Sequence, residues 1–329
     1  MKKQVRLKIE NISLVIACVL FVLMFGAGAI HYDHFGSLST FLNLFNDNAY
    51  LIVVATGITF VLLTGGIDIS VSSVVAFTCV LSAYLLQLGW SAAVVICIVL
   101  VIGLLNGFLI GYCVQELKIQ PFIITLASQF LLRGMCAVVS TVSIPIENNF
   151  YKAAALNKIA FKIGRTNAKL YLYVFLALAV VCVAFYVLNF TRFGRTVYAI
   201  GSNELSAGYM GLNVKWVKIG VYMISSFCAA LGGVIFSFYT LAGYSLQNMG
   251  MELDAISSAV IGGTLLTGGV GNVLGSVVGV LIQGVIQTIV TYQNLNAWWT
   301  RVTIAALLCL FIVLQRIISI RADKRKGGH

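Results

Sequence analysis

Residues 62–71 read LLTGGIDISV and place an acidic residue, Asp68, inside an apolar stretch that runs from Tyr50 to Leu88. A carboxylate at membrane depth costs about 2.5–3.5 kcal/mol on insertion scales, so such a group usually lies beside a water-filled path or a broken helix. The adjacent Gly65 and Gly66 allow the backbone to break there. The stretch therefore indicates a chain that moves a solute across a bilayer.

The overall composition places the chain in a membrane. Of its 329 residues, 60% are hydrophobic and 9% are charged, with a mean hydropathy of +1.00, whereas soluble domains carry about 25% charged residues. The apolar runs are continuous rather than alternating, which favours helices over a transmembrane β-barrel. We therefore expect an all-α polytopic membrane protein in which residues 1–329 form a single transmembrane domain.

Apolar segments long enough to cross a bilayer of ~30 Å begin at ten places in the chain. They start near Ile12, Ala49, Val71, Ser91, Pro121, Leu170, Lys218, Leu253, Asn272 and Trp298. Glycines interrupt the stretch from Leu253 to Val290, which predicts either two spans or a re-entrant segment followed by one span. We expect about ten transmembrane helices, one or more of them broken or re-entrant.

Glycines recur at every fourth position in two of these segments, at 103, 107 and 111 and at 271, 275 and 279. This spacing puts small residues on one face of a helix and favours close helix packing. Packing within the chain and packing against a second subunit both fit the pattern.

Basic residues set the predicted orientation. Four of the first eight residues are basic, as are five residues within 316–326. An even number of spans puts both termini on one side, and the positive-inside rule makes that side the cytoplasm. The loop 191–216 is then cytoplasmic and the segment 143–169 lies outside, although it is also basic. We expect a multi-pass protein of the bacterial inner membrane, and the net charge of +11 does not indicate a nucleic-acid partner.

Motifs for energy conversion and catalysis are missing from the sequence. There is no G-x-x-x-x-G-K-[ST] phosphate loop, no catalytic triad and no metal-binding pattern. We therefore expect no enzyme activity, metal or bound cofactor, and any ATP would be hydrolysed by a partner subunit. An ion-coupled secondary transporter of a small polar solute is the alternative. Asp68 is a single intramembrane acid, however, and ion coupling usually relies on a cluster of them. Accumulation that persists after ATP depletion would favour this alternative.

The cytoplasmic loop contains a predicted short helix. Residues 191–214 read TRFGRTVYAIGSNELSAGYMGLNV. Ser202 or Asn203 can cap the helix, Glu204 suits its positive end, and Gly211 is a plausible stop. We expect one or two helical turns whose apolar side chains, Leu205, Tyr209 and Met210, dock on a partner surface; a mere connecting loop is the alternative.

Three separated blocks carry a resemblance to a known family. Residues 65–71 (GGIDISV), the loop 198–212 and residues 249–264 (MGMELDAISSAVIGGT) are similar to motifs in the permease subunits of bacterial sugar ABC importers of the ribose, xylose and galactose type. Ser72 departs from the usual glycine, and residues 205–208 lack the family's terminal arginine. The resemblance covers nearly the whole chain.

Within that family the chain resembles the galactofuranose permeases most. The similar blocks are residues 122–127, 143–146, 261–271 and 298–300. This resemblance implies galactofuranose as the transported monosaccharide. It also implies four kinds of partner: a second permease that is a different chain, a cytoplasmic ABC ATPase, an extracytoplasmic sugar-binding protein and membrane lipid.

The resemblance assigns roles to three groups of residues. The residues expected to couple the permease to its ATPase are Gly201, Asn203, Glu204, Ala207 and Gly211. Those expected at the translocation path or at helix breaks are Gly65, Gly66, Asp68, Ser70, Gly262 and Gly263. Glu252 and Asp254 are expected near the outer mouth, where they either meet the binding protein or are solvated. Asp68 either caps backbone amides at the break or touches sugar hydroxyls.

Overall fold

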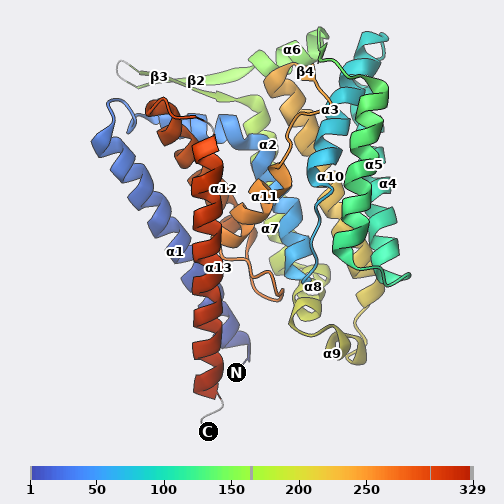
Figure 1. Ribbon diagram of the computed structural model, residues 1–329, viewed down its shortest axis with the longest axis vertical. Coiled ribbons are helices and arrows are strands. Elements are labelled where there is room, and N and C mark those ends of the chain that lie inside the picture. Colours follow the sequence, from blue (N-terminus) through green and yellow to red (C-terminus); the bar gives the residue numbers. More distant parts are fainter. Residues whose placement is uncertain (1, 164–165, 297, 327–329) are drawn as a thin grey trace.

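The computed structural model describes residues 2–163, 166–296 and 298–326, and most of them are helical (Figure 1). The helices are α1 (Lys2–His31), α2 (Leu38–Leu63), α3 (Val71–Gln87), α4 (Ala92–Gln115), α5 (Pro121–Val139), α6 (Asn149–Leu156), α7 (Leu172–Phe190), α8 (Arg192–Ser202), α9 (Glu204–Tyr209), α10 (Val214–Thr240), α11 (Met251–Ile261), α12 (Val273–Tyr292) and α13 (Trp298–Lys326). The predicted all-α polytopic fold is confirmed.

Seven of the described helices are long and apolar enough to cross a membrane: α1, α2, α4, α5, α7, α10 and α12. Two shorter apolar helices, α3 and the stretch 298–313 of α13, accompany them. With α11 they account for the ten predicted apolar segments in the predicted order. Both marked chain ends and the α8–α9 region lie at the same end of the molecule (Figure 1).

Helices α2 and α10 form the centre of the bundle. Both are buried over most of their length, whereas α4, α5 and α7 are mostly exposed. A helix that is apolar all round and buried belongs to a core, and an exposed apolar helix needs lipid around it. The fold therefore places α2 and α10 inside the bundle, together with the mostly buried α12, and turns α4, α5 and α7 toward the hydrocarbon.

The first glycine stripe serves packing within the chain. A Cβ at Gly107 would lie 2.5 Å from the Tyr222 carbonyl oxygen, and one at Gly111 would lie 2.8 Å from the Ile219 Cα. The second stripe brings α12 against α11, because Gly275 meets Gly262. Small residues let helix backbones approach this closely, so within-chain packing accounts for both patterns.

Two helices are broken rather than continuous. The backbone leaves α2 after Leu63, runs through 64–70 without helix, and resumes as α3. Helix α11 has 11 residues, a rise of about 16 Å that is half of a bilayer core. The segment that begins near Leu253 is therefore not a full helical span; it is a half-helix followed by the loop 262–272, which is the re-entrant alternative.

Short strands occupy the end of the molecule opposite the chain termini (Figure 1). Strand β1 (Ile144–Pro145) pairs antiparallel with β4 (Ala242–Gly243), in the register Ile144↔Gly243. Strands β2 (Lys158–Ile163) and β3 (Thr166–Tyr171) form a second antiparallel pair. The expected loop over 143–169 therefore contains small sheets and α6. Pairing satisfies backbone groups that would otherwise be left without partners near the hydrocarbon.

Candidate translocation path and coupling end

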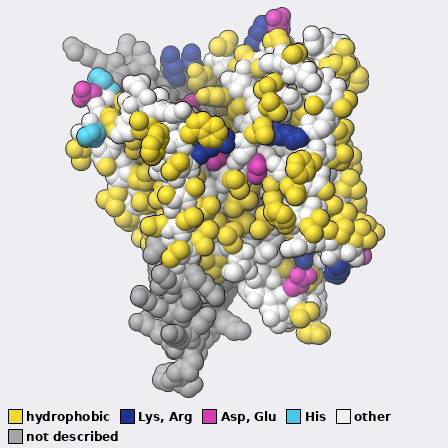
Figure 2. Space-filling model, viewed as in Figure 1, with side chains coloured by type: hydrophobic (Ala, Val, Ile, Leu, Met, Phe, Trp, Pro, Cys, Tyr) yellow, Lys and Arg dark blue, Asp and Glu magenta, His cyan; other side chains and the backbone are white. Residues whose placement is uncertain are grey.

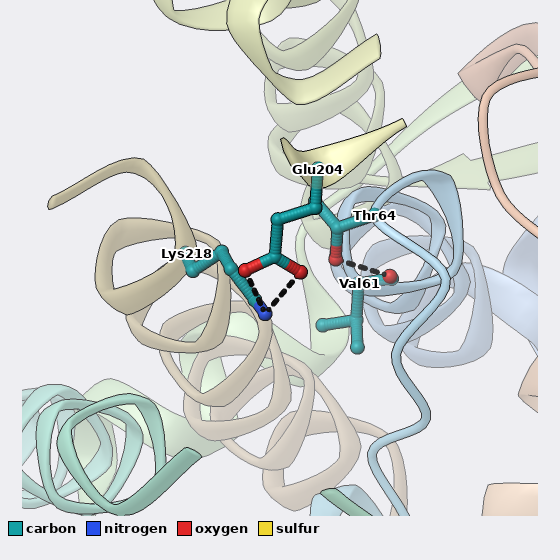
Figure 3. Close-up of polar contacts among 4 residues, drawn as sticks. All are labelled: Val61, Thr64, Glu204 and Lys218. Atoms are coloured by element: carbon teal, nitrogen blue, oxygen red, sulfur yellow. Dashed lines mark hydrogen bonds and ion pairs between the residues drawn. The ribbon is translucent and has the colours of Figure 1, made fainter. Parts of the chain in front are cut away.

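The break after α2 is built by its own sequence. Thr64 Oγ1 donates a hydrogen bond to the Val61 carbonyl at 2.8 Å (Figure 3). Gly65 follows with a φ of +78°, which suits glycine. A Cβ at Gly66 would lie 2.5 Å from the Tyr222 hydroxyl. The pair Gly65–Gly66 therefore turns the chain and lets α10 approach, as a predicted helix break requires.

Asp68 lies fully buried at the end of this break. Its Oδ1 accepts hydrogen bonds from the Ser70 amide at 3.0 Å and the Ser70 hydroxyl at 2.6 Å. Its Oδ2 accepts from the Ser225 hydroxyl on α10 at 2.7 Å. Hydrogen bonding satisfies the buried carboxylate, and the contacts fit the backbone-capping role of the two predicted for it. Ser70 is itself buried and faces Asp68.

The break after α11 contains no acidic side chain and relies on glycines. Gly262 ends the helix against Gly275, and Gly263 takes a φ of +98°. The loop that follows is closed by the Leu265 amide, which donates to the Val270 carbonyl at 2.9 Å. Tight backbone contact here replaces the hydrogen-bonded side chains of the first break.

The two breaks meet each other and the C-terminal end of α8. The Gly269 amide donates to the Leu63 carbonyl at 2.9 Å. A Cβ at Gly201 would clash with both of those backbone groups, and one at Gly268 would lie 2.7 Å from the Gly65 nitrogen. We call these five residues, Leu63, Gly65, Gly201, Gly268 and Gly269, the glycine junction. It joins three segments that are far apart in the sequence through backbone contact.

The loop 191–214, the predicted coupling region, contains two helices where one was predicted. Helix α9 has the expected cap, because Asn203 Oδ1 accepts from the Ser206 amide at 2.8 Å, and Gly211 follows with a φ of +76°. Helix α8 was missed, although the sequence carries a signal for it. Thr191 caps it, and Phe193, Val197 and Ile200 recur at helical spacing.

The α9 helix has one face fixed to the bundle and one face free. Glu204 forms a bidentate ion pair with Lys218 of α10, at 3.0 and 2.9 Å (Figure 3). Ala207 is fully buried. The opposite face presents Leu205, Tyr209 and Met210, which are 73%, 90% and 68% exposed. Such an exposed apolar surface is the kind that a partner protein covers.

The two acidic residues predicted at the outer mouth lie in different surroundings. Glu252 is buried, and its Oε1 accepts from the Gln129 amide at 3.1 Å. Asp254 lines two open cavities together with Arg301. The sequence reasoning did not single out Arg301, although an arginine within an apolar helix is a signal for a polar path. Among the described residues, no cluster of His, Cys, Asp or Glu could hold a metal ion.

Two broken helices that meet inside an all-α membrane bundle define the class of a membrane transport protein. Comparison with known proteins specifies the family. Residues 40–312 match the family described as the permease component of branched-chain amino acid transport systems. The chain belongs to this family of transport permeases.

Several relatives match along nearly their full length. The chain is 44% identical to the inner membrane ABC transporter permease protein YjfF of Escherichia coli K12, over 97% of this chain and 96% of the relative. It is 38% identical to the fructose import permease FruG of Bifidobacterium longum, over 98% and 96%. It is 34% identical to the ribose import permease RbsC of Haemophilus influenzae, over 94% and 93%. No solved structure matches the chain.

Proposed function

We propose that this chain is the permease subunit of an ATP-binding-cassette importer of monosaccharides. The observation that carries the proposal is the full-length similarity to two permeases whose names state fructose and ribose import. The broken helices support it, because half-helices at membrane depth are where transporters bring polar groups to a solute. Energy comes from a separate ATPase, since the sequence has no phosphate loop.

The proposed partners fit the exposed surfaces. The apolar face of α9 suits a cytoplasmic ABC ATPase that docks by apolar contact. On the face shown in Figure 2, charged side chains lie among hydrophobic ones in the upper half and again at the lower right. A second permease subunit is a further proposed partner, as the family resemblance implies. A sugar-binding protein would deliver the substrate at the end that carries β1–β4.

The proposed location is the bacterial inner membrane with both termini in the cytoplasm. The basic residues at the two ends of the chain support this orientation through the positive-inside rule. The α8–α9 coupling end lies on the same side as the termini (Figure 1). An ATPase on that side would have direct access to it.

The proposed substrate is galactofuranose. This choice rests on the resemblance of residues 122–127, 143–146, 261–271 and 298–300 to galactofuranose permeases. The relatives' names state fructose, ribose and other sugars. Galactofuranose is therefore a more specific proposal than those names support.

The proposed mechanism uses the glycine junction as a mechanical link. Closure of the ATPases would displace α9, and the Glu204–Lys218 pair would carry that displacement to α10. Gly201 at the end of α8 contacts both Leu63 and Gly269, so the same movement would reach both breaks. Packed elements that switch between discrete arrangements transmit motion in this way. Gly201, Asn203, Glu204, Ala207 and Gly211 are the proposed coupling residues.

Reconstitution tests the proposal. The permease is placed in liposomes with its candidate second permease, ATPase and binding protein, and ATP hydrolysis is measured with galactofuranose, ribose or galactopyranose. Stimulation by galactofuranose alone supports the importer and its substrate. Stimulation by another sugar keeps the importer and changes the substrate. Uptake that continues without ATP on an ion gradient would identify the secondary transporter instead.

A further inference from the structure

Three cavities open at the end of the bundle that carries the short strands. The first, of about 370 Å³, is lined by Thr40, Asn43, Asp47, Asn48, Tyr50, Tyr239, Gly284, Gln287, Thr288, Thr291 and Tyr292. The second, of about 410 Å³, lies between α11, α12 and α13, and the third, of about 300 Å³, lies between Tyr50 and Arg301. Each has the size of a small-molecule pocket.

The three cavities are neighbours, because several residues line more than one of them. Gln287 and Thr291 line both the first and the second. Asp254 and Arg301 line both the second and the third, and Tyr50 lines the first and the third. We call the three cavities, with the five residues that they share, the outer vestibule.

The chemistry of the outer vestibule suits a neutral ligand with many hydroxyls. Asp254 supplies carboxylate acceptors, Arg301 supplies guanidinium donors, and the Gln287 amide supplies both. The Tyr50 ring adds an apolar face with a polar tip. Mixed donors and acceptors beside aromatic surface are typical of sites that orient a small polar molecule.

The polar groups are held in place by their neighbours. Arg301 donates to the Met249 carbonyl at 3.1 Å and stacks on the Trp298 ring at 5.1 Å. The Asp254 carbonyl accepts from the Gln283 amide of α12 at 2.9 Å. Fixed groups lose little freedom when a ligand binds, which strengthens binding.

We propose that the outer vestibule is a monosaccharide-binding site of the translocation path, in which Asp254, Gln287 and Arg301 hydrogen-bond the sugar hydroxyls. The inference rests on the proposed function and adds a site to it. The sugar released by the binding protein is held here before it passes the breaks. Selectivity is then shared between the binding protein and the permease.

The site is connected to the nearer break through one short helix. Asp254 lies in the first turn of α11, and Gly262 ends the same helix. Eight residues of helix rise about 12 Å. A sugar that binds Asp254 therefore contacts α11, whose other end is the second break. Binding of the sugar and opening of that break would then involve the same helix.

Transport kinetics provide the first test. Asp254→Asn and Gln287→Ala are compared with Asp33→Asn, which changes an exposed acid in the loop 32–37 outside the cavities. In the reconstituted complex, each vestibule variant is expected to raise the KM for sugar uptake roughly tenfold, since each removes a hydrogen bond to the sugar. Asp33→Asn is expected to behave as the wild type. An unchanged KM in both vestibule variants would overturn the inference.

Protection of an introduced thiol tests binding without transport. Thr291→Cys places a cysteine in the wall shared by two cavities, and the unsubstituted protein, with its own eight cysteines, gives the background. Methyl galactofuranoside is expected to slow modification by a charged thiol reagent in vesicles that lack the binding protein, whereas glycerol is not. Slowing by ribose or fructose instead supports the site and changes the sugar.

The two failures are distinguishable. A wild-type complex without ATP-dependent uptake of any sugar contradicts the proposed function. A wild-type complex that takes up sugar, in which no sugar protects Thr291→Cys, contradicts the vestibule alone.

Discussion

The two helix breaks solve the same problem by different means. Backbone groups freed within a membrane must find partners in the protein. At residues 64–70 the partners include a buried carboxylate, Asp68, which accepts three hydrogen bonds. At residues 262–272 the described side chains include no acid, and the backbone closes on itself and against Gly275. The first break should therefore depend on side-chain chemistry, and the second on the absence of side chains.

The difference suggests different tasks. A break sealed by hydrogen bonds to α10 is tied to the centre of the bundle. The second break has no carboxylate that ties it to α10; besides its glycine contacts it is held by backbone hydrogen bonds and by the Tyr198 hydroxyl, which donates to the Gly271 carbonyl at 2.9 Å. The glycine junction joins the two through the bond between Gly269 and Leu63. The second break is thus the better candidate for the moving part and the first for the fixed part.

The largest effect is expected at the junction, where both breaks are disturbed together. Gly201→Ala places a methyl group against the Leu63 carbonyl and the Gly269 backbone, and overpacking costs about 1–3 kcal/mol or more. We expect ATP-driven uptake to be lost and thermal stability in detergent to fall. Gly208→Ala is the matched control, because a Cβ there meets open space on α9. Wild-type uptake by Gly201→Ala would contradict the proposed link.

The second break alone is tested by Gly262→Ala. The added methyl group would clash with the Gly275 carbonyl, and we expect a loss of about 2–3 kcal/mol in stability with impaired uptake. Gly134→Ala on the exposed helix α5 has open space around its Cβ and serves as the control. Equal melting temperatures for the two variants would show that glycine packing does not seal this break.

The first break is tested by two substitutions of Asp68. Asp68→Ala leaves the hydroxyls of Ser70 and Ser225 without their acceptor, which costs about 1–3 kcal/mol. Asp68→Asn keeps one acceptor oxygen and is expected to cost less. Thermal unfolding and uptake are measured for both. Normal stability with abolished uptake in Asp68→Asn would favour the sugar-contacting role over the backbone-capping role.

The smallest effect is expected outside both breaks, at the cap of α9. Asn203→Ala removes the acceptor for the Ser206 amide, which costs about 1 kcal/mol of local helix stability. We expect global stability to be unchanged and ATPase binding to weaken by a few-fold. Asn203→Asp keeps the cap and should preserve binding. If Asn203→Ala binds the ATPase like the wild type, the cap is not needed for docking.

Local sequence features predicted the two helix breaks. The pair Gly65–Gly66 marked the first break and Gly262–Gly263 the second, because glycine adopts the positive φ that ends a helix. Asn203 was recognised as a cap because short side-chain acceptors suit that position. Helix α8 was missed, since its apolar residues were read as part of a loop. The strands over 144–171 were missed because they are too short for an alternating pattern to stand out.

The outer vestibule could not be predicted in the same way. Tyr50, Asp254, Gln287 and Arg301 lie on four helices and are separated by up to about 250 positions. No spacing rule relates them. Only Asp254 among them was singled out, because it lies in the block 249–264 that carries the family resemblance.

The sequence by itself determined that the chain is an all-α membrane protein with interrupted helices. Long apolar runs must form helices in hydrocarbon, and paired glycines end those helices. Both effects are local, because they act between residues within a few helical turns of one another. Tertiary structure alone decided that α11 stops halfway, that Asp68 bonds Ser225, and that Gly201 joins the two breaks. Those outcomes depend on contacts between distant segments, whose geometry is set only when the helices pack.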